Sequence, residues 1–170
     1  LYGESNLGKQ LLLSRRLIQN GAKFVGAVHA GWDHHQDIKE NMTNMVPEVD
    51  KAIAALILDL SILRILNDTL VIITTEFGRT GLNSGIVAGI GREPGRDHAP
   101  SITPLLLSVP KYGGSIIGTT DKNALSVKDS PFYPLDLLRT ICEHMNVENI
   151  TYLDNGRPRY ILETDSMIII

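Results

Sequence analysis

Apolar runs and helical periodicities alternate along this chain, and that alternation constrains its fold more than any other feature of the sequence. The patterns follow one another in this order: helix 10–19, strand 23–29, helix 44–66, strand 69–75, strand 102–109 and helix 134–145. Continuous apolar runs are typical of strands that are covered on both faces, and strands that alternate with helices usually pair in parallel. We therefore predict an α/β fold with a largely parallel sheet flanked by helices.

The predicted sheet has few strong strands, which indicates an incomplete fold. The chain also opens at Leu1 without an initiating Met. We therefore expect residues 1–170 to form a single α/β domain that is the carboxy-terminal part of a larger domain, with its amino-terminal half missing. An export signal would lie on that half, so the residues themselves give no localisation.

Composition and charge exclude some classes of protein. With 43% hydrophobic and 21% charged residues and a net charge of -3, the chain is typical of a globular domain and has no basic surplus for nucleic acid. The single Cys142 can form neither an internal disulfide nor a Cys-rich metal site. No apolar run approaches the ~20 residues of a membrane-spanning helix. We expect neither nucleic acid as a partner nor a membrane span.

Three polar clusters interrupt the apolar pattern. They read GWDHH at 31–35, EFGRT at 76–80 and GRDH at 95–98; two follow a predicted strand and the third precedes one. Loops at the strand ends of a parallel sheet converge on one crevice, where ligands bind. We therefore expect the three clusters to share one site.

The residue types in the clusters are those of a metal site. Asp33 and His35 lie two apart, and a carboxylate with an imidazole suits Zn, Mn or Fe better than Ca. Glu76 adds an anionic ligand or a general base, and His98 adds a second imidazole. The candidate metal ligands are therefore Asp33, His35, Glu76 and His98, with a divalent metal as cofactor.

The remaining charged residues of the clusters are candidates for catalysis. Arg79 and Arg96 can hold a phosphate or sulfate through forked hydrogen bonds. Asp97 completes the catalytic candidates, and an anionic small molecule or ester is the expected substrate. Structural interpretations stay open for the same residues: Glu76 can pair with Arg79, and Asp97 with His98 can stabilise a turn.

Two common catalytic motifs are absent from the sequence. Gly89-Ile90-Gly91 does not lead from a strand into a helix, and no Gly-Lys-Ser/Thr follows, so a phosphate loop is not supported. The chain has no Gly-x-Ser-x-Gly elbow either, which leaves a serine hydrolase without support.

The ordered motifs resemble a known family. GWDxH at 31–35, EFGRT at 76–80 and GRDHxP at 95–100 resemble the bacterial proteins with "domain of unknown function 1501" (DUF1501), which are abundant in planctomycetes. Arg15-Arg16-Leu17 and Gly156-Arg157-Pro158 fit that pattern too, so the resemblance spans nearly the whole chain.

The resemblance carries implications for fold and chemistry. Those proteins are similar to the alkaline phosphatase and sulfatase superfamily, whose members hydrolyse or transfer phosphate and sulfate esters with metals at the ends of parallel strands. The resemblance implies that Asp33 and His35 occupy the positions of the superfamily's Asp and His metal ligands. It also implies that His98 occupies the position of a metal-binding His that comes late in the superfamily's sequences. Glu76-Phe77 replaces the superfamily's Asp-His pair, and the nucleophile belongs to the missing half. By the same resemblance, the protein can be an exported one, located in the periplasm or outside the cell.

Two functions follow from these residues and the resemblance. The first is a fragment of a metal-dependent hydrolase of phosphate or sulfate esters. The alternative is a non-catalytic binding or structural domain with a degenerate alkaline-phosphatase-like site, since fold does not imply function.

Overall fold

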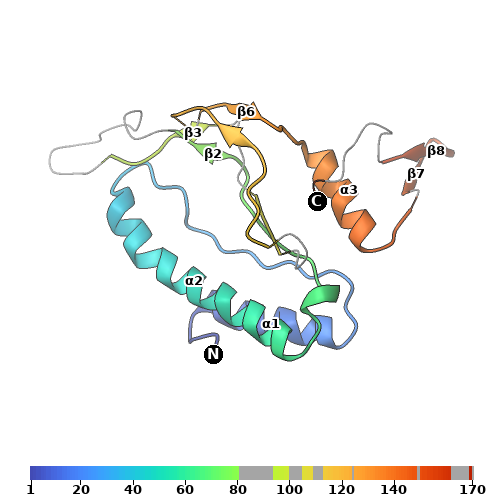
Figure 1. The fold of residues 1–170 in the computed structure, drawn as a ribbon, viewed down its shortest axis with the longest axis horizontal. Coiled ribbons are helices and arrows are strands. Elements are labelled where there is room, and N and C mark those ends of the chain that lie inside the picture. Colours follow the sequence, from blue (N-terminus) through green and yellow to red (C-terminus); the bar gives the residue numbers. More distant parts are fainter. Residues whose placement is uncertain are drawn as a thin grey trace.

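Two helices hold the main apolar core of the protein. The computed structural model describes residues 1–80, 94–99, 105–108, 113–123, 125–148, 150–161 and 169. Helices α1 (Asn6–Gln19) and α2 (Ile38–Ile62) lie side by side, and one long connection links the end of α1 to the start of α2 (Figure 1). The buried residues of this core are Tyr2, Leu7, Leu11, Ala52, Ala55, Leu56 and Leu60.

All three predicted helices are confirmed, with shifted ends. Helix α1 begins earlier than the periodicity indicated, because the Ser5 hydroxyl accepts a hydrogen bond from Gly8 N at 3.0 Å and caps the first turn. Helix α2 starts six residues before the predicted position 44 and ends at Ile62, where the left-handed Arg64 (φ 59°) turns the chain away. Helix α3 (Pro134–His144) starts with Pro, whose missing N–H is not needed there, and Cys142 is buried on it.

The side chain of Tyr2 joins the two core helices. Its hydroxyl donates to Asp59 Oδ2 at 2.9 Å, and Arg15 Nε donates to the same oxygen at 2.7 Å. Burial, reinforced by the Asp59 hydrogen bond, raises the pKa of Tyr2 to about 12. The hydroxyl is therefore protonated at neutral pH and acts as a donor.

We expect Tyr2→Phe to lower the free energy of unfolding by about 1.5–3 kcal/mol, the usual contribution of a hydrogen bond to a charged group. Urea unfolding followed by circular dichroism measures the change. Tyr160→Phe is the matched control, because Tyr160 is 70% exposed and should leave the free energy of unfolding unchanged. Equal stabilities for the two variants would contradict the role of Tyr2.

The prediction of a largely parallel, alkaline-phosphatase-like sheet is wrong. The described strands form four separate two-stranded sheets, and all four pairs are antiparallel. Strands β1 (Val71–Thr74) and β4 (Leu105–Ser108), which fall inside the predicted strands 69–75 and 102–109, pair with Val71 opposite Ser108. A parallel pair needs a crossover, usually a helix, and the described residues between β1 and β4 contain none.

The other sheets are short hairpin-like pairs. Strand β2 (Gly78–Arg79) pairs with β3 (His98–Ala99). Strand β5 (Thr119–Thr120) pairs with β6 (Val127–Asp129), and β7 (Thr151–Asp154) pairs with β8 (Arg157–Tyr160) across the Asn155-Gly156 turn. The β7–β8 hairpin lies near α3, away from the two core helices (Figure 1).

The predicted strand 23–29 is also wrong. This segment belongs to the connection between α1 and α2 and has no strand partner among the described residues. Phe24 and Val28 are 73% and 78% exposed, so the apolar run is not covered as a buried strand would be. Its end nevertheless delivers the first polar cluster to the start of α2.

No helix in the described part of the chain is long and apolar enough to cross a membrane.

Candidate metal centre

Three segments that lie far apart in the sequence meet around the loop that leads into α2. Gln36 and Pro94 form an isolated antiparallel bridge, and beside it Arg96 N donates to His34 O at 2.9 Å. In the β2–β3 pair, Arg79 lies opposite His98. These backbone contacts place the polar clusters at 31–35, 76–80 and 95–98 next to one another, at antiparallel contacts and not at the ends of parallel strands.

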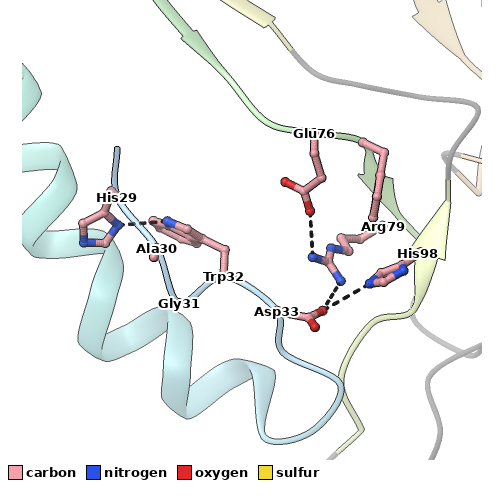
Figure 2. A pocket seen from close by; sticks show the side chains of 9 residues that line it. His29, Ala30, Gly31, Trp32, Asp33, Glu76, Arg79 and His98 are labelled. Atoms are coloured by element: carbon pink, nitrogen blue, oxygen red, sulfur yellow. Dashed lines mark hydrogen bonds and ion pairs between the residues drawn. The ribbon is translucent and has the colours of Figure 1, made fainter. Parts of the chain in front are cut away.

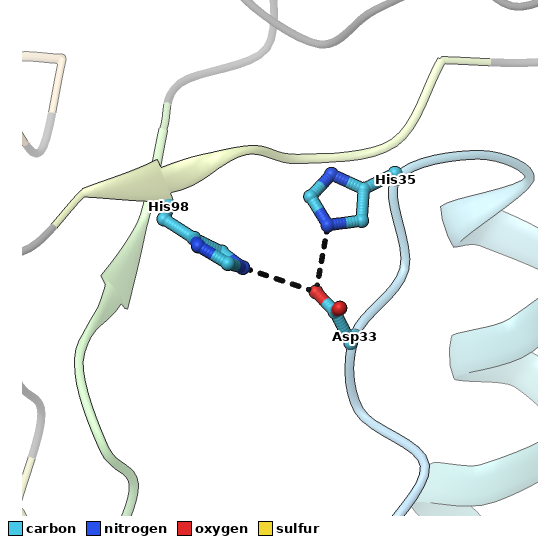
Figure 3. A group of neighbouring side chains, drawn as sticks. All are labelled: Asp33, His35 and His98. Carbon is cyan, nitrogen blue, oxygen red and sulfur yellow. Dashed lines mark hydrogen bonds and ion pairs between the residues drawn. The ribbon is translucent and has the colours of Figure 1, made fainter.

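Asp33 is the hub of the site. Its Oδ1 accepts a hydrogen bond from Arg79 Nη1 at 2.6 Å (Figure 2). The same oxygen lies 2.9 Å from His35 Nε2 and 3.2 Å from His98 Nε2, so two imidazoles point at it from different segments (Figure 3). One carboxylate oxygen is thus surrounded by three nitrogens, two of which can carry a lone pair instead of a proton.

These neighbours stabilise the ionised form of Asp33. The hydrogen bond from Arg79, followed by that from His98, lowers the pKa of Asp33 from 3.8 to about 2. A pKa depressed in the folded state contributes stability above the unfolded value, and this contribution is lost as the pH falls through the folded value. The carboxylate is therefore available as an anionic ligand at any pH above about 4.

We expect the carboxyl carbon of Asp33 to titrate with a midpoint near 2 in a carbon NMR experiment on the labelled protein. Arg79→Gln removes the largest cause of the shift, so the midpoint should rise towards the ordinary 3.8. Arg159→Gln, which removes an exposed Arg paired with Asp154 at 3.4 Å, is the control and should leave it unchanged. A midpoint of 3.8 in the unaltered protein would contradict the observed geometry.

His35 lies between two carboxylates. Its Nδ1 is 3.0 Å from Asp97 Oδ1, and its Nε2 faces Asp33. Asp97 is itself fixed to Thr80, the residue after β2, because its N donates to Thr80 Oγ1 at 3.0 Å and its carbonyl accepts from Thr80 N at 2.9 Å. When Nδ1–H donates to Asp97, the lone pair of His35 is on Nε2 and points at Asp33. A carboxylate behind a histidine is the usual support of a metal-ligating imidazole.

The ring of His98 is held by two other rings. Its centroid lies 4.5 Å from that of Phe77 and 5.2 Å from that of His35, with tilted planes in both cases. These contacts direct His98 Nε2 towards Asp33.

The spacing of these nitrogens and this oxygen suits a metal ion. Asp33, His35 and His98 each offer one ligand atom, and the three atoms all lie within 4.8 Å of one another. Two atoms that bind one ion at about 2.1 Å, at 90–110° to each other, stand about 3.0–3.4 Å apart. The 2.9 Å and 3.2 Å separations from Asp33 Oδ1 are close to that spacing.

A pocket of about 310 Å³ opens beside the three candidate ligands. Its lining residues are His29, Ala30, Gly31, Trp32, Asp33, Glu76, Phe77, Arg79 and His98 (Figure 2). Trp32 Nε1 donates to His29 Nδ1 at 2.9 Å, which fixes the indole on one side of the pocket. Glu76 and Arg79 lie on the other side, joined by a contact of 3.2 Å.

Comparison with known proteins places the chain in a family. The profile of the family described as "Protein of unknown function (DUF1501)" matches residues 1–169. The chain belongs to the DUF1501 family. No curated protein and no solved structure gave a match. The resemblance on the three motifs is therefore correct at the level of the DUF1501 family.

Within this DUF1501 chain, the candidate metal ligands separate into two groups. Asp33, His35 and His98 come together, whereas Glu76 lines the pocket and contacts Arg79 Nη2. The structural interpretation of Glu76, as a partner of Arg79, is thus seen in the structure. None of the three converging ligand atoms belongs to Glu76.

The candidate catalytic residues occupy three different positions. Arg79 lies in the pocket, and Asp97 lies behind His35. Arg96 does not line the pocket, and its Nη1 is buried without a hydrogen-bond partner among the described residues. The sequence did not single out Trp32 and Phe77 as pocket residues; their place inside the DUF1501 motifs, next to Asp33 and Glu76, was the available signal.

Proposed function

We propose that this DUF1501 chain binds a divalent metal ion through Asp33, His35 and His98, and that the metal serves the hydrolysis of phosphate or sulfate esters. The observation that carries the proposal is the convergence of one carboxylate oxygen and two imidazole nitrogens within 4.8 Å. Two nitrogens and one oxygen suit Zn, Mn or Fe, whereas Ca and Mg prefer all-oxygen ligands.

The surrounding side chains support a catalytic centre rather than a closed structural one. Three protein ligands leave coordination positions open, as in catalytic metal sites. Asp97 orients His35, and the Asp33 and His98 side chains are 62% and 49% exposed, so the centre is accessible from the pocket. When bound, the metal would activate water and polarise the ester.

Arg79 gives the pocket a group for the anionic part of the substrate. Its guanidinium is positively charged at every accessible pH and matches the planar spacing of phosphate and sulfate oxygens. It lies within hydrogen-bond distance of the candidate ligand Asp33, so an oxyanion on Arg79 would be next to the metal. This arrangement supports an anionic ester as the substrate class.

A non-catalytic site is the second candidate, and one observation favours it. Arg79 already bridges Asp33 and Glu76, at 2.6 Å and 3.2 Å, so the same residues can form an ion-pair network that only joins three segments. In that case Arg79 takes the place of the metal as the counter-charge of Asp33.

Metal analysis and activity assays distinguish the two functions. The protein is purified without chelator, its metal content is measured, and the metal-free protein is titrated with Zn²⁺, Mn²⁺ and anaerobic Fe²⁺ by calorimetry. Hydrolysis of p-nitrophenyl phosphate and p-nitrophenyl sulfate is then followed with each metal. We expect one metal per chain and metal-dependent release of nitrophenol. Metal binding without ester hydrolysis would support a non-catalytic metal site. Absence of metal binding would favour the ion-pair network.

A further inference from the structure

The pocket beside the candidate metal centre has two chemically different walls. Trp32 and His29 form one wall, with ring centroids 5.4 Å apart and planes at 62°. Glu76, Arg79 and His98 form the facing wall, and Asp33 lies between the two walls (Figure 2). A ligand that fills the pocket therefore meets an aromatic surface at one side and charged groups at the other.

The volume and lining of the pocket fit a ligand with one ring. At about 310 Å³ it lies at the small end of ligand-binding pockets, which suits a molecule of one ring and a small charged group. Trp32 is half-buried and fixed by its hydrogen bond to His29, so its indole is a rigid surface for a ring. Aromatic faces bind flat apolar surfaces at low entropic cost because few torsions are lost.

The charges of the pocket change sign when a metal binds. Among the described lining residues, Asp33 and Glu76 bring two negative charges and Arg79 brings one positive charge, so an anion would meet a net negative lining in the absence of metal. A divalent cation on Asp33 and the two histidines reverses that balance. The anion site is therefore complete only in the metal-bound protein.

Metal binding also changes what Arg79 can do. Its Nη1 donates to Asp33 Oδ1, the oxygen on which both imidazoles converge. A metal held by Asp33 would compete with Nη1 for this oxygen and would free that nitrogen. Nη2 remains next to Glu76, and the ring of Phe77 lies 5.5 Å from the guanidinium carbon, so Arg79 keeps its position.

Resting on the proposed metal site, we propose that this pocket binds a ring-bearing oxyanion, with the ring on Trp32 and the oxyanion on Arg79, and that metal binding opens the site by releasing Arg79 from Asp33. The recognised chemistry is a phosphate- or sulfate-like group attached to one ring with an apolar face. An aryl ester and a sugar ester both carry that chemistry.

Binding of stable probes to the whole chain tests the proposal. Calorimetry compares phenylphosphonate, a hexose 6-phosphate, methylphosphonate and phenol, each with and without saturating Zn²⁺. We expect a ring-bearing oxyanion to bind roughly 3- to 10-fold more tightly than methylphosphonate, the usual contribution of one aromatic contact. Phenol should bind weakly, and omitting Zn²⁺ should lower the affinity for the ring-bearing oxyanion at least about 10-fold. The stronger of phenylphosphonate and the hexose phosphate identifies the ring as aromatic or carbohydrate.

Tryptophan fluorescence locates the bound ring. The chain has one Trp, so emission on excitation at 295 nm reports on Trp32 alone. We expect phenylphosphonate to change that emission in the presence of Zn²⁺, and methylphosphonate to change it less. Trp32→Leu should bring the two phosphonates to equal affinity. If that variant loses Zn²⁺ binding, the emission titration of the unaltered protein decides the position of the ring.

Arg79→Gln tests the anion-binding half of the proposal. The substitution should lower the affinity for phenylphosphonate roughly 10- to 100-fold, the range for hydrogen bonds to a charged group. The affinity for Zn²⁺ should stay equal or rise. Arg159→Gln is the control and should change neither.

The outcomes separate this inference from the proposed function. Zn²⁺ binding with equal affinities for phenylphosphonate, the hexose phosphate and methylphosphonate, or with oxyanion binding that does not depend on Zn²⁺, overturns the inference and leaves the metal site intact. Absence of Zn²⁺ binding overturns both.

Discussion

His35→Ala is expected to weaken Zn²⁺ binding by more than about 100-fold and to abolish any metal-dependent hydrolysis. The substitution removes a nitrogen that lies 2.9 Å from Asp33 Oδ1 and leaves two of the three converging ligand atoms. Loss of a group that only supports a ligand costs about 10–100-fold in affinity or activity, so loss of the ligand itself should cost more. Calorimetry with Zn²⁺ and the p-nitrophenyl assays measure both effects.

Two further variants make the His35 result specific. His144→Ala removes an exposed histidine at the end of α3 and should leave Zn²⁺ affinity unchanged. Asp97→Asn keeps the shape of the side chain 3.0 Å from His35 Nδ1 but removes its charge, so it should lower Zn²⁺ affinity by about 10–100-fold. If the His35 variant retains full metal stoichiometry, the metal centre is not built from these residues, and the ion-pair network becomes the preferred function.

The helices were predictable from the sequence because their signals are local. The repeat of apolar residues along 44–66 depends on neighbours within one or two turns. The Ser5 cap is a local signal too, but the prediction did not use it and began the first helix at residue 10. Strand pairing depends on which distant segments meet, and no local pattern contains that information. The apolar run at 23–29 is a strand pattern without a strand partner in the described structure, and β1 meets β4 antiparallel.

The candidate site was expected at the strand ends of a parallel sheet, and that reason is wrong. The structure brings Asp33, His35 and His98 together through the β2–β3 pair and the bridge between Gln36 and Pro94 instead. What the sequence could not supply is the direction of each side chain. Asp97 supports His35 instead of facing the pocket, and Arg96 does not line it. The parallel sheet was thus not needed to gather the site.

Gly95→Ala is expected to disrupt the candidate site while leaving the helical core folded. A Cβ at position 95 would overlap the backbone of His34, His35 and Gln36, which cannot give way as a flexible side chain can. The bridge between Gln36 and Pro94 must then open, with loss of the hydrogen bond from Gly95 N to His35 O at 3.1 Å. Asp97 and His98 follow Gly95 closely in the chain, so both would move away from His35 and Asp33.

We expect this displacement to lower Zn²⁺ affinity at least about 10-fold, since it removes the support of His35 and moves the ligand His98. Helical circular dichroism should persist, because the core of α1 and α2 contains no residue of the 94–99 segment. Gly26→Ala is the matched control: a Cβ there meets nothing within 4 Å, so Zn²⁺ affinity should not change. Should Gly95→Ala bind Zn²⁺ as tightly as the unaltered chain, the ion would not depend on the approach of the 95–98 segment to the 33–35 loop. His98 would then not be a ligand, and the centre would have to be completed by other residues.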